Sequence, residues 1–186
     1  DVSFSHPAST LRGSGRQVGG ALKHISCTIE DGSFVLLCGT SGCGKTTMTR
    51  LFNGLIPHYH EGTYTGSVYL DGKDTRDLSL FDISLKVGSV FQNPRSQFFN
   101  VDTTSELAFG PENHGMPEDI VRDRVKRVAA QLKLEPLLDR SIFSLSGGEK
   151  QKIACGSAAA IDPDVYVLDE PSSNLDACIL IRQKNQ

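Results

Sequence analysis

Four short apolar runs, separated by glycine-rich turns, predict strands along this chain. Residues 34–38 are continuously apolar and lead into a glycine-rich loop, which indicates a strand buried on both faces. Residues 66–71, 87–91 and 165–168 are the other expected strands. Asp71-Gly72 is expected to turn the chain after the first of these three.

Short strands are also expected over residues 1–36. Ile25, Cys27 and Ile29 alternate with other residues, and Asp31-Gly32 follows them as a turn. Residues 46–53 place apolar side chains on one helical side, so a helix is expected there.

The pattern becomes helical between about 95 and 160. Apolar residues recur at helical spacing in one stretch, at Ile120, Val121, Val125, Val128, Ala129 and Leu132. Basic residues lie between them, at Arg122, Arg124, Lys126 and Arg127. They form either a patch for nucleic acid or, as is usual, a solvated helix face. Strands on both sides of a helical insert predict an α/β fold with a helical subdomain.

Composition matches that of a soluble globular protein, with 38% hydrophobic and 22% charged residues and a net charge of -3. The charge offers no general basis for binding nucleic acid or an anionic membrane. No apolar run reaches the roughly 18 residues of a membrane-spanning helix, so membrane contact is expected only through a partner protein. The cysteines are scattered and include no CxxC pair, which argues against a zinc site and fits a reducing cytosol.

The strongest chemical signal is GTSGCGKTT at 39–47, which fits the pattern GxxxxGK[ST]. Its glycines let the backbone approach a phosphate, and the following helix offers its positive end. Lys45 is expected at the β- and γ-phosphates, and the Thr46 hydroxyl suits Mg²⁺. Alkylation of Cys43 is expected to block this site. The residues expected to bind nucleotide are Gly39, Thr40, Ser41, Gly42, Cys43, Gly44, Lys45, Thr46 and Thr47.

Three polar residues follow expected strands. Asp169 is expected at the carboxyl edge of the sheet, where ligands bind in α/β folds, and to orient Mg²⁺ through a coordinated water. Glu170 points elsewhere and is the candidate for polarising an attacking water. Gln92 is the candidate sensor of Mg²⁺ and the terminal phosphate.

Between these elements lies LSGGEKQ at 145–151. Ser146 with Glu149 predicts a capping box, so a helix is expected over about 147–160. The amides of Gly147 and Gly148 at that helix end suit an anion. The phosphate loop already holds its own phosphates, so the segment is either a helix cap alone or a cap whose helix end also binds phosphate.

With GTSGCGKTT, VFQNP, LSGGEKQ, VYVLDEP and SSNLD in this order, the chain resembles the ATP-binding-cassette (ABC) ATPases over essentially its whole length. The resemblance implies a P-loop NTPase fold with a mainly parallel core sheet, an N-terminal antiparallel β subdomain and an inserted helical subdomain. It implies one incomplete domain over 1–186. Residues 1–94 and 160–186 would form the nucleotide-binding core, and residues 95–159 the helical subdomain.

The same resemblance implies MgATP hydrolysis between two such domains. Ser146 and Gly148, beside Gly147, would face the γ-phosphate held by the other domain, and Asp176 would lie at the seam. The segment after Gln92 would contact a transmembrane transporter subunit, which places the protein on the cytoplasmic face of the membrane.

A narrower resemblance is carried by LFNGLIPH at 51–58 and ELAFGPEN at 106–113. Both are similar to the energy-coupling-factor ATPases, which power uptake of vitamins and metal ions. The chain departs from the family twice. His6 stands where a tyrosine commonly stacks on adenine, which implies a weaker stack. No histidine follows Asp176, where the family has a switch histidine, so the chain as given is expected to be a fragment with little or no turnover alone.

Two other functions share these motifs. A non-transport ABC ATPase of DNA repair would carry a long coiled coil between the phosphate loop and LSGGEKQ, and one of translation would carry basic inserts. Only about 100 residues separate Lys45 from Ser146, without sustained heptads. A truncated domain that binds nucleotide without turnover fits the missing histidine.

Overall fold

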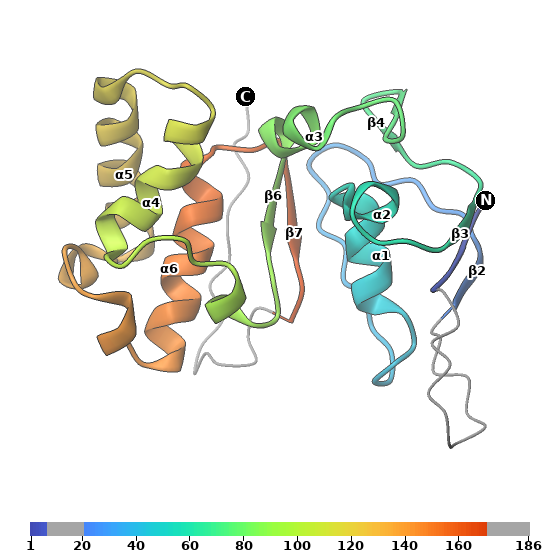
Figure 1. The fold of residues 1–186 in the computed structure, drawn as a ribbon, viewed down its shortest axis with the longest axis horizontal. Helices are drawn as coiled ribbons and strands as arrows, with labels where there is room; N and C mark the ends of the chain where they lie inside the picture. Colours follow the sequence, from blue (N-terminus) through green and yellow to red (C-terminus); the bar gives the residue numbers. More distant parts are fainter. Residues whose placement is uncertain (7–20, 171–186) are drawn as a thin grey trace. The chain divides into compact units, whose positions relative to one another are not determined.

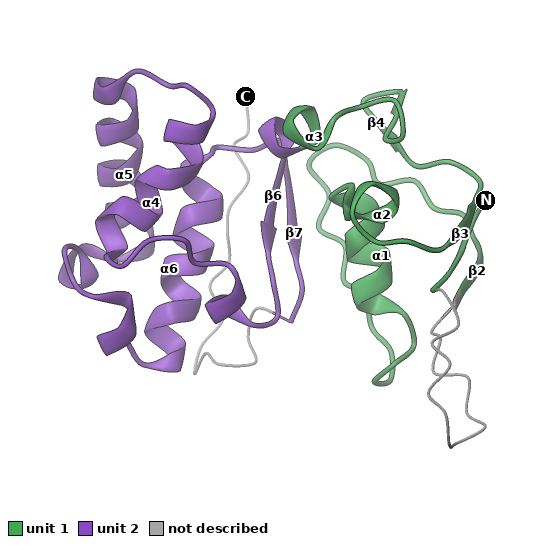
Figure 2. Ribbon diagram, in the orientation of Figure 1, with its two compact units in different colours: residues 1–83, 182–186 green, residues 84–181 purple. Residues whose placement is uncertain are grey.

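A computed structural model describes residues 1–6 and 21–170. The chain divides into two compact units, residues 1–83 with 182–186, and residues 84–181 (Figure 2). Asp176 and the rest of SSNLD lie outside the described residues, as does Cys178. Among the described helices, none combines the length and the hydrophobicity needed to cross a membrane.

The first unit contains a three-stranded antiparallel sheet. β1 (Val2–Ser5) lies between β2 (Ala21–Ile25) and β3 (Thr63–Thr65) (Figure 1). The helices α1 (Lys45–Phe52) and α2 (Leu55–His58) share a core with this sheet. The buried residues of that core are Val2, Phe4, Leu22, Leu51 and Ile56. The helix predicted over 46–53 is therefore confirmed.

A short hairpin follows the sheet. β4 (Tyr69–Leu70) pairs with β5 (Lys73–Asp74), and Asp71-Gly72 turns the chain with φ values of 50° and 75°. Two consecutive positive φ angles are typical of the type I′ hairpin turn, so the predicted turn is confirmed. The strand expected over 66–71 is shortened to its last residues before the turn. The helix α3 (Leu80–Lys86) comes next.

Two predictions for the first unit are wrong. Residues 34–38 form no strand, and the side chains of Phe34 and Leu36 are 80% and 73% exposed. β2 ends at Ile25, so Cys27 and Ile29 are exposed outside any strand. An apolar run becomes a buried strand only where neighbours satisfy its backbone hydrogen bonds and cover its side chains. The described residues of this unit supply no such neighbours for 34–38.

The second unit contains two parallel strands, β6 (Val87–Val90) and β7 (Val165–Leu168). Val87 lies opposite Val165, and the pairing continues in register to the ends of both strands. Gly88 permits a close approach, because an added Cβ would lie 2.7 Å from the Pro163 ring. The strands predicted at 87–91 and 165–168 are confirmed.

Helices fill the sequence between these strands, as predicted. α4 (Thr103–Asn113), α5 (Glu118–Leu132) and α6 (Gly147–Ala160) pack on one another (Figure 1). Their common core also takes in residues from the segment between α5 and α6. The single-turn 3₁₀ helices of this unit are η1 (Pro94–Ser96), η2 (Glu135–Leu137) and η3 (Ile142–Ser144).

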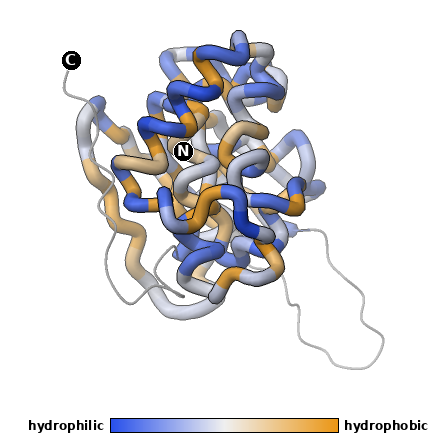
Figure 3. The backbone as a smooth tube through the Cα atoms, turned by 90° about the vertical axis from the view of Figure 1, so that its left-hand side faces the viewer, coloured by the Kyte–Doolittle hydropathy of each residue, from blue (hydrophilic) through white to orange (hydrophobic). Residues whose placement is uncertain are grey.

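α5 is amphipathic, and hydrophobic and hydrophilic positions alternate along the helices in Figure 3. Its buried residues are Val121, Val125, Val128 and Ala129. Ile120, which was expected on the same face, is 43% exposed.

Two arginines of α5 bond to the end of α6. Arg124 donates to the carbonyl oxygens of Ala160 and Ile161, at the end of α6. Arg127 lies 3.2 Å from Asp162, just beyond that end. Cations near a helix C-terminus satisfy its last carbonyls and favour its dipole. These arginines therefore have a structural role in joining α5 to α6.

Candidate functional site

The phosphate loop is shaped by glycines in left-handed conformations. Gly42 and Gly44 have φ values of +79° and +103°, and Gly44 is the N-cap of α1. A side chain at Gly44 would also place its Cβ 2.6 Å from Leu22 Cδ2. The N-cap Gly44 makes no side-chain cap hydrogen bond to this helix end, and the amides at a helix N-terminus suit an anion. The loop therefore has the geometry of an anion cradle.

Lys45 folds back over this loop. Its Nζ donates to the carbonyl oxygens of Gly39 and Thr40, at 3.0 and 3.2 Å. Gly39 is also confined, because an added Cβ would lie 2.5 Å from Cys43 Sγ. The ammonium thus stands at the mouth of the loop, where a bound phosphate can replace the carbonyl oxygens as its partner.

His6 lies beside the first turn of α1. Its Nε2 is 3.5 Å from Thr47 Oγ1, and its ring packs edge-to-face on Phe4 with centroids 4.8 Å apart. Thr46 is half-buried, whereas Thr47 is buried. The structure therefore brings His6 next to the phosphate-loop helix, with its ring fixed by two neighbours.

In the second unit, Gln92 and Glu170 meet beyond the ends of β6 and β7. The ladder extends one step, since the Asp169 N–H donates to the Val90 carbonyl at 2.9 Å. Gln92 Nε2 then donates to Glu170 Oε2 at 2.8 Å. The Asp169 side chain is buried, whereas Glu170 is exposed and has a φ of +49°. A positive φ is uncommon for glutamate. The three predicted residues are thus brought together at one sheet edge.

The LSGGEKQ segment forms the capping box expected of it. The Ser146 hydroxyl accepts from the Glu149 N–H at 3.3 Å, and Glu149 Oε2 accepts from the Ser146 N–H at 2.7 Å. These hydrogen bonds, with Arg140 at 3.2 Å from Oε1, hold the pKa of Glu149 below its ordinary range. Gly147 and Gly148 begin α6, as predicted. Ser146 and Gly147 are exposed, so this helix end is open to solvent.

Sequence reasoning missed the residues that fix the segment after Gln92. Gln97 accepts the Phe91 N–H at 3.2 Å and donates to the Ala154 carbonyl at 3.4 Å. It therefore ties this segment to α6. An amide side chain shortly after a strand was the available signal, and it is a weak one by itself. Among the described residues, no group of three His, Cys, Asp or Glu is placed to hold a metal.

Comparison with known proteins identifies the family of this chain. The ABC transporter family matches residues 22–173, most of the chain. The chain belongs to this family. Its fold is that of the ABC ATPase cassette.

Two relatives named as ABC transporter ATP-binding proteins illustrate the ABC match. One, from Treponema denticola, is 55% identical over 152 residues, covering 82% of this chain and 31% of the relative. Another, from Pyrococcus horikoshii, is 44% identical over 179 residues, covering 95% of this chain and 59% of the relative. The chain thus spans about a third of the length of the first of these curated relatives.

Solved ABC cassettes share the fold. CbiO1 from Clostridium perfringens, described as part of the ABC transporter complex CbiONQ, aligns with a TM-score of 0.70 and 28% identity. The alignment covers 94% of this chain and 67% of CbiO1. The cassette MJ0796, in a dimeric post-hydrolysis state with ADP and phosphate, aligns with a TM-score of 0.74 and 25% identity. That alignment covers 95% of this chain and 77% of MJ0796.

Proposed function

We propose that this chain binds ATP and belongs to an ATPase that powers an ABC transporter. The observation that carries the proposal is the phosphate loop. Gly44 opens α1 without a side-chain cap, and Lys45 lies over the loop at 3.0 Å from the Gly39 carbonyl. A cradle of amides beside an ammonium suits a polyphosphate, because both kinds of group stabilise its negative charge.

Within this proposal, residues 39–47 hold the phosphates and His6 stacks on the base. The Thr47 and Phe4 contacts would hold the imidazole in place for stacking. Imidazole has a smaller face than the phenol ring of tyrosine, so the stack would add less affinity.

Thr46, Gln92 and Asp169 are the proposed protein groups for Mg²⁺. Their hydroxyl, amide and carboxylate oxygens are the hard ligands that this ion takes. The absence of a three-residue acidic or histidine cluster among the described residues fits an ion held by few protein groups together with substrate phosphates. When bound, Mg²⁺ neutralises phosphate charge.

Glu170 is the proposed general base. The hydrogen bond from Gln92 at 2.8 Å orients its carboxylate and couples it to the residue that would sense the ion. Ser146, Gly147 and Gly148 would complete the site of a second ABC domain by donating to its bound γ-phosphate, and Asp176 would lie at the seam. The dimer of MJ0796 supports this arrangement by similarity.

We place the transporter in the energy-coupling-factor group, which takes up vitamins or metal ions. Support comes from the 51–58 and 106–113 motifs and from the likeness to CbiO1, itself part of a transporter complex. In this reading the chain lies on the cytoplasmic face of the membrane and contacts a transmembrane subunit after Gln92. The division into a core, 1–94 with 160–186, and a helical subdomain, 95–159, is part of the same proposal.

The direct test is equilibrium titration of the chain with ATP and Mg²⁺. Lys45→Ala should weaken binding by roughly tenfold or more, because a charged hydrogen-bond donor to phosphate is lost. Lys73→Ala is the matched control, since Lys73 is exposed in the β4–β5 hairpin. Absence of ATP binding, or equal affinities of the Lys45 and Lys73 variants, would overturn the proposal.

A further inference from the structure

The Glu149 carboxylate of the capping box is shared between two donors. Its Oε2 accepts the Ser146 N–H at 2.7 Å, and its Oε1 accepts a hydrogen bond from Arg140 Nη1 at 3.2 Å. Each oxygen therefore has its own partner, one at the helix end and one in the segment before it. Arg140 thus fixes the orientation of the carboxylate that caps the start of α6.

The backbone of Arg140 is itself held by Thr103, the first residue of α4. The Thr103 N–H donates to the Arg140 carbonyl at 3.0 Å, and the Arg140 N–H donates to Thr103 Oγ1 at 3.3 Å. Thr103 is fully buried, and its hydroxyl also donates to the Leu137 carbonyl at 2.6 Å. The start of α4 therefore places Arg140 beside Glu149 before any ligand binds, which is the preorganisation that a positioning residue needs.

The ion pair between Arg140 and Glu149 contributes little to stability by itself. The two side chains are 42% and 31% exposed, and ion pairs of this exposure are weakened by water and by salt. The cap does not need the arginine either, because Ser146 and Glu149 already satisfy each other. The place where the pair lies is therefore more informative than its strength.

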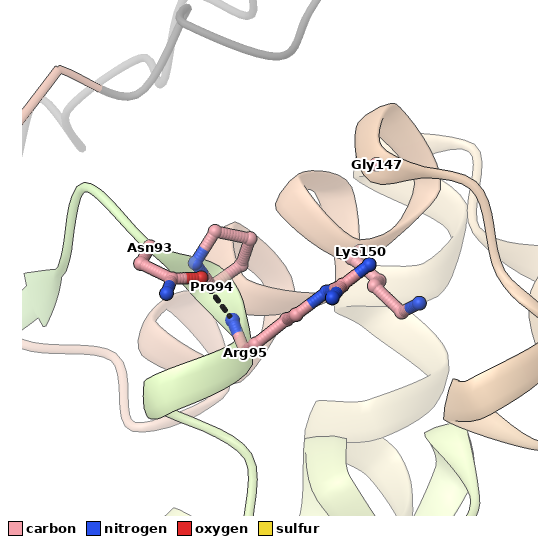
Figure 4. A pocket seen from close by; sticks show the side chains of 5 residues that line it. All are labelled: Asn93, Pro94, Arg95, Gly147 and Lys150. Atoms are coloured by element: carbon pink, nitrogen blue, oxygen red, sulfur yellow. Dashed lines mark hydrogen bonds between the residues drawn. The ribbon is translucent and has the colours of Figure 1, made fainter.

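Glu149 puts a negative charge at the helix end that would meet a phosphate of the second domain. It is the acidic residue in the first turn of α6. A carboxylate there is favoured by the helix dipole, but it repels another anion. The pocket on which Gly147 borders has a volume of about 280 Å³, and its charged lining residues are all cationic (Figure 4). The lining residues are Asn93, Pro94, Arg95, Gly147 and Lys150. The charge of Glu149 is thus the one in this turn that must be offset before a phosphate approaches.

We propose that Arg140 is a positioning residue for the nucleotide held by the second ABC domain. It keeps Glu149 on the Ser146 N–H and neutralises the Glu149 charge, so Ser146 and Gly147 meet the phosphate without a competing anion. The inference rests on the proposed function, in which this helix end meets the second domain's γ-phosphate. Arg140 need not touch the nucleotide, because it acts through Glu149.

The test measures dimerisation of the complete protein with Mg²⁺ and a non-hydrolysable ATP analogue, by sedimentation. Arg140→Met should weaken dimerisation roughly tenfold, because the uncompensated carboxylate repels the phosphate. Arg122→Met is the matched control, since it removes another exposed arginine–glutamate pair, with Glu118 in the first turn of α5. Dimerisation of Arg140→Met as tight as that of the wild type overturns the inference.

Further substitutions separate the charge of Arg140 from its effect on folding. Glu149→Gln added to Arg140→Met keeps an oxygen acceptor for the Ser146 N–H and removes the negative charge, so it should restore dimerisation. Arg140→Lys keeps the positive charge and should dimerise nearly as the wild type does. If the double variant stays as weak as Arg140→Met, Arg140 has a structural role only and the inference is wrong. If urea unfolding shows that Arg140→Met is not folded, Arg140→Gln replaces it in both comparisons, because it keeps a donor without the charge.

Binding of ATP to the phosphate loop is measured on the same variants by equilibrium titration. It should be equal in all of them, since Arg140 and Glu149 lie outside that loop. Failure of the wild-type protein to bind ATP or to dimerise would refute the proposed function and this inference with it. Normal ATP binding and normal dimerisation in every variant would refute only the role of Arg140.

Discussion

Gln92 and Glu170, separated by 78 residues in sequence, are joined by a 2.8 Å hydrogen bond from Nε2 to Oε2. The register of β6 and β7 brings them together. Val90 lies opposite Leu168 at the ends of the two strands, and Gln92 and Glu170 each follow two residues later in the chain. The carboxylate proposed to act on water is therefore oriented by the side chain proposed to sense the ion.

Glu170→Gln should preserve ATP binding and lower hydrolysis by about 10²–10⁴-fold in the dimeric full-length protein, because the amide cannot accept a proton. The dimer should persist in ATP. Size-exclusion chromatography measures the dimer, and phosphate release measures hydrolysis. Glu112→Gln, exposed on α4, serves as the control. Wild-type turnover in Glu170→Gln would show that Glu170 is not the general base.

Ser146 has two separable roles, in the helix cap and in the proposed contact with a second domain's phosphate. Ser146→Ala should lower the free energy of unfolding by about 1 kcal/mol through loss of the cap. Ser146→Asp keeps a cap acceptor but adds a negative charge, so it should unfold like wild type and fail to dimerise with ATP. Urea unfolding and light scattering distinguish the two effects. Normal dimerisation of the Ser146→Asp variant would show that Ser146 does not contact the second domain's phosphate.

Acid should destabilise the second unit, because carboxylates stabilise the N-termini of two of its helices. Asp102 caps α4 by accepting the Ser105 N–H at 2.8 Å, and this hydrogen bond lowers the pKa of Asp102. At the start of α6, the hydrogen bond from the Ser146 N–H lowers the pKa of Glu149. Both carboxylates bind protons less readily in the folded state than in the unfolded one. Their stabilisation is thus full above the ordinary carboxyl range and is lost as pH falls below about 4. Asp102→Asn retains a cap without titrating, so its urea midpoint should depend less on pH between 3 and 6. An identical pH dependence would exclude this origin.

Alkylation of Cys43 should block ATP binding, because the exposed thiol lies in the phosphate loop against Gly39. Burial raises the pKa of the Cys155 thiol to about 11, so Cys155 should not react near pH 7.5. Cys27 and Cys38 are exposed, so these two and Cys178 must first be replaced by serine. In that background, full modification of Cys43 with unchanged ATP affinity would contradict the prediction. ATP binding that no longer responds to the alkylating reagent in a Cys43→Ser variant would confirm it.

Glu106 should matter for stability through the segment before α4. It is 1% exposed and accepts hydrogen bonds from Phe99 and from the backbone and side chain of Asn100. Glu106→Ala should lower the free energy of unfolding by about 1–3 kcal/mol, because buried donors lose their acceptor. Glu106→Gln keeps an oxygen acceptor and should lose less. Equal urea midpoints for the two variants would show that the acceptor is unimportant.

Local rules predicted much of this molecule. The capping box at Ser146 and Glu149 depends on residues three apart, and the turn at Asp71-Gly72 depends on two neighbours. Both appear in the structure as the sequence indicates. The strands at 87–91 and 165–168 were also predicted, since apolar runs with breakers on either side describe buried strands well.

Features that depend on distant residues were not predictable in this way. The run 34–38 has the composition of a buried strand, but composition does not supply the neighbours that would pair with it. The hydrogen bond from Gln92 to Glu170 needs the strand register, which neither residue specifies alone. The pocket at Arg95 and Lys150 likewise arises because two segments more than fifty residues apart are packed together.

The reciprocal hydrogen bonds between Ser146 and Glu149 also bear on how quickly and how tightly two such domains could associate. The helix end that would meet the second domain's nucleotide is already rigid, held by contacts of 2.7 and 3.3 Å. Little conformational entropy remains to be lost at this end when the domains meet. Association would then depend mainly on the nucleotide itself, so the nucleotide state alone could time the closing and opening of the pair.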